Sequence, residues 1–300
     1  MNRLSKKTHA PLDPAAPCPC GSGLPYGDCH APSDRRRAEL RRAGEETPTR
    51  AMIKTPAQIA GIREAGRVNA AVLDAVAAAM PDCRTTADID RVVRDATAAL
   101  GGIPTCLGFE GFPAAVCTSV NDVVCHGIPS SDVPLRPGDI VNVDCTTTYG
   151  GYVGDASRMF IIGGETSAER AALVALTRRA VEETVAMLRP YTVHLGDIGA
   201  SIGRMARAAG YSVVREIGGH GVGLSMHEDP YVCHVGTPGT GMVLMPGMVF
   251  TIEPMINAGS RFFTIDTQDG WTVRTADGRP SAQVEYMVLI TDDGHEILSR

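Results

Sequence analysis

The chain has 300 residues, of which 44% are hydrophobic and 21% charged, a composition that suits one large core with a small appendage. The net charge of −6 is uneven, because residues 1–50 carry nine Lys or Arg against six Asp or Glu and the rest is acidic. An acidic body argues against a domain that coats nucleic acid. No run approaches the roughly 20 apolar residues that cross a bilayer, and the first 15 residues lack the apolar stretch of a signal peptide, so we expect a cytoplasmic protein with no membrane association.

The front of the chain combines a polar, Pro-rich stretch at 1–17, which predicts disorder, with a cysteine cluster. Four soft ligands fall within thirteen residues, too few for a hydrophobic core, so metal-driven folding is the favoured explanation. A disulfide with one spare thiol is the alternative, and it is unusual in a cytosolic chain. The predicted structural zinc ligands are Cys18, Cys20, Cys29 and His30. The other six cysteines have no framework spacing and are interpreted as buried thiols.

The elements predicted along the chain begin with a short charged helix over 34–46. Thr55-Pro56 is a helix start signal, and apolar spacing predicts a helix from there to about Met80. The remaining expectations are a helix at 86–100, strands within 114–163 that turn at Gly150-Gly151, helices at 166–189 and 197–209, and strands with Gly-rich loops from 213 onward.

One motif occurs twice, as PLRPGDIVNVD at 134–144 and VLMPGMVFTIE at 243–253. In both copies Leu-x-Pro-Gly opens an apolar strand, and an acid stands seven residues after the proline. Moving the helix starts near 55 and 86 by the same 109 residues brings them near 164 and 195, where the next helices are expected. The sequence therefore predicts an α/β (α+β) fold made of two equivalent halves around a pseudo-twofold axis, with Asp144 and Glu253 in matching positions.

Several acids stand where apolar strands end. Asp144 alone is better explained as a turn cap, but a hairpin at 150–151 would bring Asp155 beside it. A single histidine in a loop such as that of His220 is more often structural. Glu253 and Glu285 interrupt strongly apolar strands that contain no Lys or Arg, so each needs a compensating partner. Four carboxylates and one imidazole form an oxygen-rich site that suits two divalent ions and hydrolysis.

These segments resemble, in order and spacing, those of type I methionine aminopeptidases: NDVVCHGIP, VNVDCTT, GDASRMF, GGHGVG, MHEDP, FTIEP and SAQVEY. The resemblance covers about residues 52–300. It implies the pita-bread fold, removal of N-terminal methionine from nascent chains and peptides with a small second residue, and attack by a water activated between two ions of Co, Mn, Fe or Zn. The metal ligands implied are Asp144, Asp155, His220, Glu253 and Glu285.

The resemblance also implies catalytic roles for three residues. His126 would contact the scissile amide nitrogen, His227 would stabilise the developing oxyanion, and Glu253 would move protons. The methionine pocket implied consists of Cys106, Phe109, Phe112, Cys117, Met226 and Trp271, together with the two histidines. The chain departs from the family pattern at four positions: Phe109 and Phe112 replace tyrosines, Met226 replaces a Phe, and Tyr286 replaces a His. These changes bear on side-chain preference and turnover rather than on the reaction class.

The segment CPCGSGLPYGDCH resembles the SEC-C zinc knuckle, a binding module. We expect a disordered tail at 1–17, a knuckle and charged linker at 18–50, and a metallopeptidase domain at 51–300. Residues 18–50 would dock at the ribosome or nascent chain, helped by arginines, and the protein would be a monomer. The alternatives are a peptidase that cleaves before proline, a non-catalytic binding protein of the same fold, and a chain whose primary function is the knuckle. The complete ligand set and the lack of room for a further N-terminal domain disfavour them.

Overall fold

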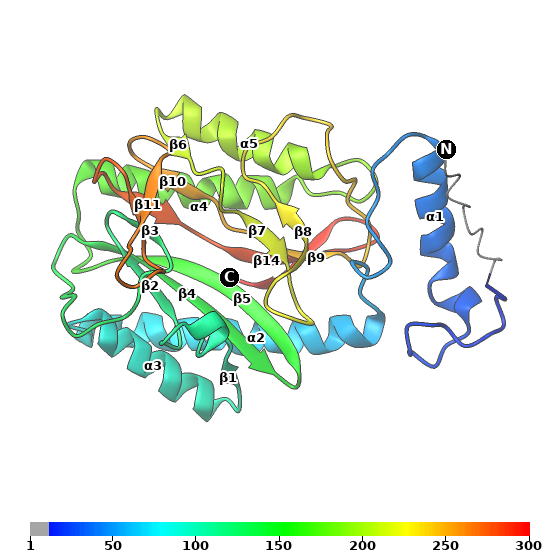
Figure 1. The fold of residues 1–300 in the computed structure, drawn as a ribbon, viewed down its shortest axis with the longest axis horizontal. Coiled ribbons are helices and arrows are strands. Elements are labelled where there is room, and N and C mark those ends of the chain that lie inside the picture. The colour runs from blue at the N-terminus through cyan, green and yellow to red at the C-terminus, as the bar shows by residue number, and fades with distance from the viewer. Residues whose placement is uncertain (1–11) are drawn as a thin grey trace, which may run out of the picture.

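A computed structural model describes residues 12–300 of the chain (Figure 1). Its α-helices are α1 (Ala31–Arg42), α2 (Pro56–Ala79), α3 (Thr86–Ala99), α4 (Ala168–Ala186) and α5 (Leu195–Ala208), with single 3-10 turns at Tyr26–Asp28, Met80–Asp82 and Phe109–Gly111. The four helices of the body match the predicted ones to within a few residues. None of the described helices is long and apolar enough to cross a membrane.

Two larger sheets lie between the helix pairs α2–α3 and α4–α5 (Figure 1). In the first sheet, β4 (Ile140–Tyr149) pairs with β1 (Ile103–Pro104), β2 (Cys117–Val120) and β5 (Tyr152–Ile161). The second sheet has the order β15 (His295–Ser299), β14 (Tyr286–Ile290), β9 (Val249–Ile252), β7 (Gly219–Gly221) and β8 (Glu228–Val232). An isolated bridge between Ser157 and Glu285 joins the two sheets.

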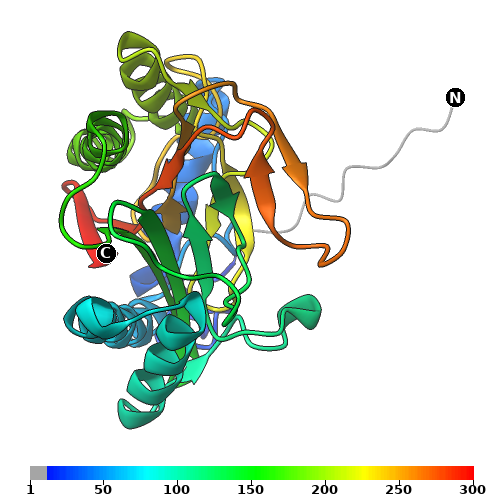
Figure 2. The ribbon, with the colours of Figure 1, turned by 90° about the vertical axis from the view of Figure 1, so that its left-hand side faces the viewer.

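The remaining strands form two three-stranded sheets. One has the order β13 (Ser281–Gln283), β10 (Met255–Asn257) and β6 (Ser212–Val213), and the other β11 (Phe263–Ile265), β12 (Val273–Thr275) and β3 (Val123–Cys125). In Figure 2 the helices lie largely on one side of the strands, and the β11–β12 hairpin stands out on the other side.

The predicted duplication is confirmed by equivalent contacts in the two halves. α3 and α5 are both 14 residues long and begin 109 residues apart. Each follows a backbone bridge to its own Leu-x-Pro-Gly segment, Thr85 to Pro134 in the first half and His194 to Val243 in the second. The spacing of the Leu-x-Pro-Gly motif therefore reflects a repeated helix–helix–strand unit, and it places β4 and β9 in matching positions.

The helix that opens the body is positioned by local chemistry. Thr55 and Gln58 form a capping box at the start of α2, with Pro56 at the first helical position. Gly154 of β5 lets this helix approach closely, because a Cβ there would lie 2.4 Å from the Ala65 carbonyl oxygen. The close packing fixes the strand that carries Asp155.

The N-terminal segment packs against the second half. Leu40 of α1 is buried in the core around α4 and α5, and the Val243 N–H donates to the Glu46 carbonyl at 2.8 Å. Farther along, Ile53 bridges to Met248. The predicted charged helix is present but runs from Ala31 to Arg42, and so begins and ends a few residues before the expected range.

Candidate functional site

The two aspartates predicted as ligands lie on paired strands of the first half. β4 and β5 form the expected hairpin, whose turn is made by Gly150 and Gly151 with positive φ angles of 58° and 84°. Asp155 pairs across the ladder with Thr146, and Asp144 pairs with Ser157. The hairpin register thus brings both carboxylates to one region of the sheet.

The other three predicted ligands come from the second sheet. His220 lies in β7, Glu253 follows β9 directly and Glu285 precedes β14. Asp155, His220 and Glu285 each offer a ligand atom within 4.8 Å of the others, and His220 Nε2 lies 3.4 Å from Glu253 Oε1. All five residues line one cavity of about 450 Å³. The structure therefore gathers the whole predicted set at the junction of the two sheets.

Burial controls the electrostatics of this cavity. It raises the pKa of Asp144 to about 7 and that of Glu253 to about 8. Burial, with repulsion from neighbouring carboxylates, also raises the pKa values of Asp155 and Glu285 well above their usual range. Within residues 12–300, no Lys or Arg forms a salt bridge with any of these four acids. Carboxylates gathered in this way fit divalent cations, which would offset both burial and mutual repulsion.

Neutral side chains hold the acids in place. Thr146 Oγ1 donates to Asp155 Oδ1 at 2.9 Å. Glu253 accepts two hydrogen bonds, from Thr251 Oγ1 at 2.6 Å and from Gln283 Nε2 at 3.1 Å. The sequence analysis missed these three residues. Alternation would have indicated two of them, because Thr251 and Gln283 stand two residues before Glu253 and Glu285 and therefore face the same side of their strands.

A further histidine that the sequence analysis missed supports the same region from behind. His234 is 1% exposed, and its Nε2 accepts the backbone N–H of Glu253 at 3.1 Å. Burial, with the neighbouring His220, lowers the pKa of His234 to about 3, so the ring stays neutral. No short motif in the sequence indicates this contact.

The two histidines predicted to act on substrate also line the cavity. The His227 ring meets the His220 ring edge-on, with centroids 4.5 Å apart, and the Phe109 ring at 5.3 Å. His126 has a positive φ of 56° and lies edge-on to Trp271 at 6.2 Å. Burial lowers the pKa of both His126 and His227, which favours neutral imidazoles at pH 7.

The predicted pocket residues form one apolar cluster beside the acids. Phe112 packs edge-on against Trp271 with ring centroids 5.2 Å apart, and the Cys106 thiol donates to Thr146 Oγ1 at 3.6 Å. The full predicted set is present in this cluster and lines the same cavity: Cys106, Phe109, Phe112, Cys117, Met226 and Trp271. An apolar, sulfur-rich wall thus stands next to the carboxylates. Tyr286 faces elsewhere, donating from its hydroxyl to Glu182 at 3.3 Å.

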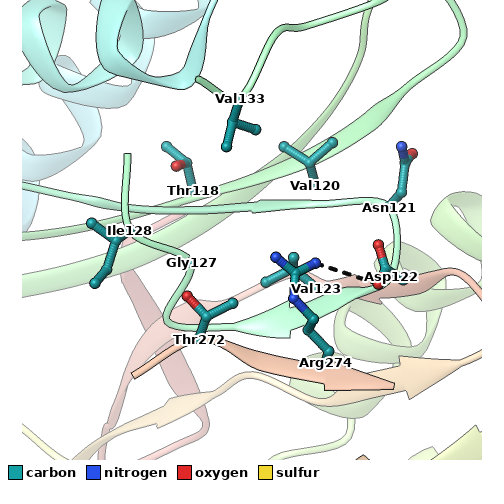
Figure 3. Close-up of a pocket in the computed structure, with 10 residues that line it drawn as sticks. All are labelled: Thr118, Val120, Asn121, Asp122, Val123, Gly127, Ile128, Val133, Thr272 and Arg274. Atoms are coloured by element: carbon teal, nitrogen blue, oxygen red, sulfur yellow. Dashed lines mark hydrogen bonds and ion pairs between the residues drawn. The ribbon is translucent and has the colours of Figure 1, made fainter. Parts of the chain in front are cut away.

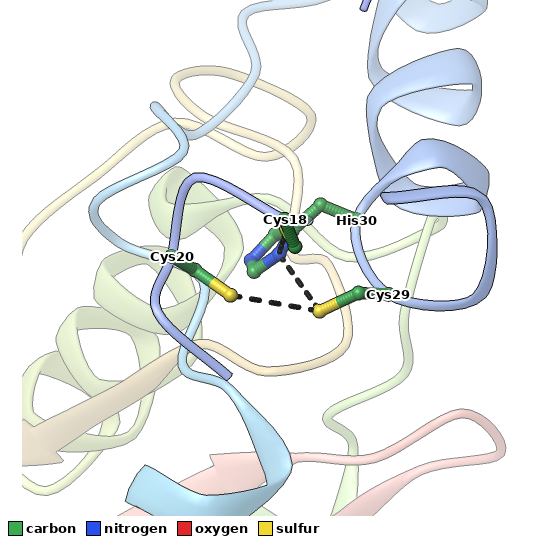
Figure 4. Close-up of side chains that lie close together, drawn as sticks. All are labelled: Cys18, Cys20, Cys29 and His30. Carbon is green, nitrogen blue, oxygen red and sulfur yellow. Dashed lines mark hydrogen bonds between the residues drawn. The ribbon is translucent and has the colours of Figure 1, made fainter. Parts of the chain in front are cut away.

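The predicted zinc ligands also lie together. One ligand atom of each of Cys18, Cys20, Cys29 and His30 falls within a 4.8 Å cluster, and His30 Nδ1 lies 3.2 Å from the sulfurs of Cys18 and Cys29 (Figure 4). Burial opposes ionisation of Cys20, but hydrogen bonds with Ser22 outweigh it and lower its pKa to about 6. Three cysteine thiols and one imidazole form a ligand set that matches a structural zinc site.

The folded knuckle begins earlier than predicted. Pro17 bridges to Pro25, and the N–H groups of Tyr26 and Gly27 donate to the carbonyls of Ala16 and Pro14. Residues that the sequence analysis assigned to a disordered tail are thus part of the knuckle. The predicted disorder of residues 1–11 concerns a segment outside the described residues.

A second cavity, of about 180 Å³, lies at the turn between β2 and β3 (Figure 3). Its polar rim includes an ion pair between Arg274 and Asp122 at 3.4 Å, and its wall includes Val120, Val133 and Ile128. The five-ligand set does not line this cavity, so the cavity of about 450 Å³ that contains the set is the candidate active site.

Fold and site together define a metal-dependent peptidase, and comparison with known proteins gives the same class. The model of metallopeptidase family M24 matches residues 60–292, and the SEC-C motif matches residues 16–32. The chain therefore belongs to metallopeptidase family M24.

The proteins similar to this chain include methionine aminopeptidases. The enzyme of Escherichia coli K12 is 43% identical over 249 residues, which cover 82% of this chain and 93% of the relative. That of Chlamydia trachomatis is 41% identical over 286 residues, covering 94% and 97%. The crystal structure of the Rickettsia prowazekii methionine aminopeptidase superposes with a TM-score of 0.79 at 40% identity, covering 83% of this chain and 99% of that one. The predicted resemblance, with its pita-bread fold, is confirmed.

Proposed function

We propose that this protein removes the N-terminal methionine from peptides and nascent chains, with a preference for a small second residue. The observation that carries the proposal is one cavity that joins five metal-type ligands, three of them buried, to an apolar wall of two thiols, a methionine and aromatic rings. Relatives at 41–43% identity with the name methionine aminopeptidase support it.

The metal ligands we propose are Asp144, Asp155, His220, Glu253 and Glu285. Bound divalent ions would supply a water acidic enough to act as a nucleophile near neutral pH. Oxygen-rich ligands with one imidazole accept Co, Mn, Fe or Zn, so the choice among these ions rests on the experiment below.

Glu253 is the proposed proton carrier, taking a proton from the attacking water and passing it to the leaving amine. The hydrogen bonds from Thr251 and Gln283 fix the direction in which its carboxylate points.

The two histidines act on the scissile bond in this scheme. His227 donates from its ring to the carbonyl oxygen as negative charge develops there, and His126 contacts the amide nitrogen. Both rings line the cavity between the ligand set and the apolar wall. The wall formed by Met226, Cys106 and the aromatic rings accommodates the flexible methionine side chain.

The decisive experiment gives the purified protein Met-Gly-Met-Met and Met-Lys-Met-Met with Mn or Co, with and without chelator. We expect methionine release from the first peptide that chelation abolishes, and much slower release from the second. No chelator-sensitive release from the first peptide would refute the activity. Equal release from both would refute the small-residue preference and leave the activity standing.

For the front of the chain we propose a knuckle, with its charged linker to residue 50, that binds one structural zinc ion and docks the enzyme at the ribosome or nascent chain. Arg35, Arg36, Arg41 and Arg42 are exposed on and beside α1, whereas Arg37 turns toward Asp34 at 3.0 Å. Exposed arginines suit an RNA-rich partner. Deletion of residues 1–50 should reduce co-sedimentation with ribosomes and preserve activity on short peptides, and unchanged co-sedimentation would refute the docking.

We further propose that the protein acts in the cytoplasm as a monomer, with residues 51–300 as the peptidase domain. All nine cysteines fall within the described residues and are free thiols, as in a reducing compartment. Size-exclusion chromatography with light scattering tests the monomer, and a mass of about twice 31.6 kDa would contradict it.

A further inference from the structure

The loop between β7 and β8 carries two residues of the proposed site, Met226 and His227. Its tip, Gly223–Ser225, has the sequence Gly-Leu-Ser, and Leu224 there is 42% exposed. Short loops of this composition do not hold one conformation without specific contacts. What fixes this loop therefore fixes the position of His227.

Glu228 organises the loop from within. Its Oε1 accepts the backbone N–H groups of Leu224 at 2.7 Å and Ser225 at 3.2 Å. The Ser225 hydroxyl in turn donates to the His227 carbonyl at 3.0 Å. One carboxylate oxygen thus closes the loop onto itself immediately beside the histidine.

The second carboxylate oxygen, Oε2, pairs with the ammonium group of Lys54. The Lys54 side chain is 1% exposed and that of Glu228 16%. Most ion pairs among the described residues are far more exposed, as in Arg63–Glu296 at 46% and 36%. A lysine charge is rarely buried unless it is paired, so we expect this ion pair to persist throughout the folded state.

Lys54 is held independently of the loop. Its backbone N–H donates to the Gly247 carbonyl at 2.8 Å, and Ile53 bridges to Met248 in the strand that leads into β9. Thr55 then starts α2 with a capping box. The lysine therefore projects from a rigid junction onto the carboxylate that holds the amides of Leu224 and Ser225.

We propose that Lys54 and Glu228 are positioning residues that hold His227 and Met226 in the active site. The inference rests on the proposed role of His227. His227 meets His220 and Phe109 edge-on at 4.5 and 5.3 Å, so a loop shift of about 1 Å would change the direction of its N–H toward substrate. The side-chain hydrogen bonds of Lys54 and Glu228 go to each other and to the loop amides rather than to the five ligands, so we expect metal binding to survive their loss.

The test compares Lys54→Met with wild-type protein, using full-length, Mn-loaded enzyme and Met-Gly-Met-Met. Lys54→Met removes the anchor of the loop to the junction. The Glu228 carboxylate, whose side chain is 16% exposed, then keeps only its two amide hydrogen bonds, so the loop can shift. We expect kcat to fall by about tenfold or more, with KM and the Mn affinity measured by calorimetry changed by less than about threefold. Lys54→Arg, which keeps the charge, should recover part of kcat.

Arg63→Met is the matched control, because it removes an exposed ion pair of the same kind from the same stretch of chain. Its kcat should equal that of wild type. A kcat of Lys54→Met within about twofold of wild type, or an equal loss in Arg63→Met, would overturn the proposal. So would a loss of Mn affinity in proportion to kcat, since that indicates general disruption of the site.

If Lys54→Met does not fold, the Glu228→Asp variant tests the proposal instead. It retains the charge but shortens the reach to Lys54 and to the loop amides, and we expect the same selective loss of kcat. Unchanged kcat in this variant overturns the proposal. Failure of the proposed function itself appears separately, as absence of methionine release by the wild-type enzyme.

Discussion

The chain contains two metal-type clusters built in opposite ways. The knuckle takes its ligands from residues 18–30, whereas the carboxylate site collects ligands from strands spread over 144–285. The knuckle has a core of only a few side chains, so we expect its fold to require a bound ion. The peptidase site sits in a body with large apolar cores, which can fold without metal but carries buried, repelling carboxylates. Metal binding would therefore drive folding of the knuckle. In the peptidase site it would offset the burial and mutual repulsion of the carboxylates.

The largest effect that this comparison predicts follows from Glu253→Gln. The change removes the proposed proton carrier and keeps the side-chain volume, so kcat should fall by about 10²–10⁴-fold. The metal-free protein should be at least as stable as wild type, because a buried like charge is lost. Rates with Met-Gly-Met-Met and thermal unfolding measure the two effects. Activity within tenfold of wild type would exclude Glu253 as the proton carrier.

The second prediction concerns the pH dependence of stability, which should distinguish the carboxylate site from the knuckle. The folded-state pKa values of Asp144 and Glu253, about 7 and 8, lie above the usual values near 4. Folding therefore favours their protonated forms, a stabilisation fully present below about pH 4 and lost as pH rises through about 7–8. The free energy of unfolding of the metal-free protein should fall by a few kcal/mol between pH 5 and 8.

Excess Mn should reverse this slope, because it binds the ionised carboxylates of the folded protein. Urea unfolding with and without Mn at each pH measures both curves. A metal-free stability that rises from pH 5 to 8 would contradict the burial of uncompensated acids. Asp155→Asn offers a matched check, since it removes one of the strongly shifted groups and should flatten the slope.

How far the sequence could predict each cluster follows from the same difference. The knuckle is local, so spacing alone indicates Cys18, Cys20, Cys29 and His30. The carboxylate site is not local, and its prediction depended on the repeated Leu-x-Pro-Gly motif and on the family resemblance. The structure contains the symmetry that the repeat predicted. The Thr86 N–H donates to the Val133 carbonyl in the first half, and the Leu195 N–H makes the equivalent bond to the Met242 carbonyl in the second.

Contacts between distant segments set the limit of that prediction. Lys54 and Glu228 are 174 positions apart, and nothing near either residue in the sequence points to the other. The hydrogen bond from the Glu253 N–H to His234 likewise depends on how β8 passes β9. Such pairs arise from packing of the whole body, whereas ligand types and strand alternation are visible in short segments.

Removal of the knuckle's metal should have an intermediate effect, confined to the front of the chain. Cys20→Ser with Cys29→Ser leaves too few ligands for zinc, so residues 13–30 should unfold and become sensitive to protease. The body should keep its midpoint of thermal unfolding to within a few degrees, since its cores lie elsewhere. Mass spectrometry of the metal content and limited proteolysis measure the result. A knuckle that stays protected without zinc would show that packing holds it.

The smallest expected effect is that of the same double substitution on catalysis. Loss of the knuckle leaves α1 attached to the body through Leu40. The linker remains bonded to the body through Glu46, and Lys54 is held separately by Gly247. The Lys54–Glu228 pair beside His227 should then persist, and kcat/KM for Met-Gly-Met-Met should stay within about twofold of wild type. Steady-state kinetics on short peptides measures this. A loss of kcat/KM above about tenfold, with wild-type Mn affinity, would instead mean that the order of the knuckle affects the loop between β7 and β8 through residues 45–54.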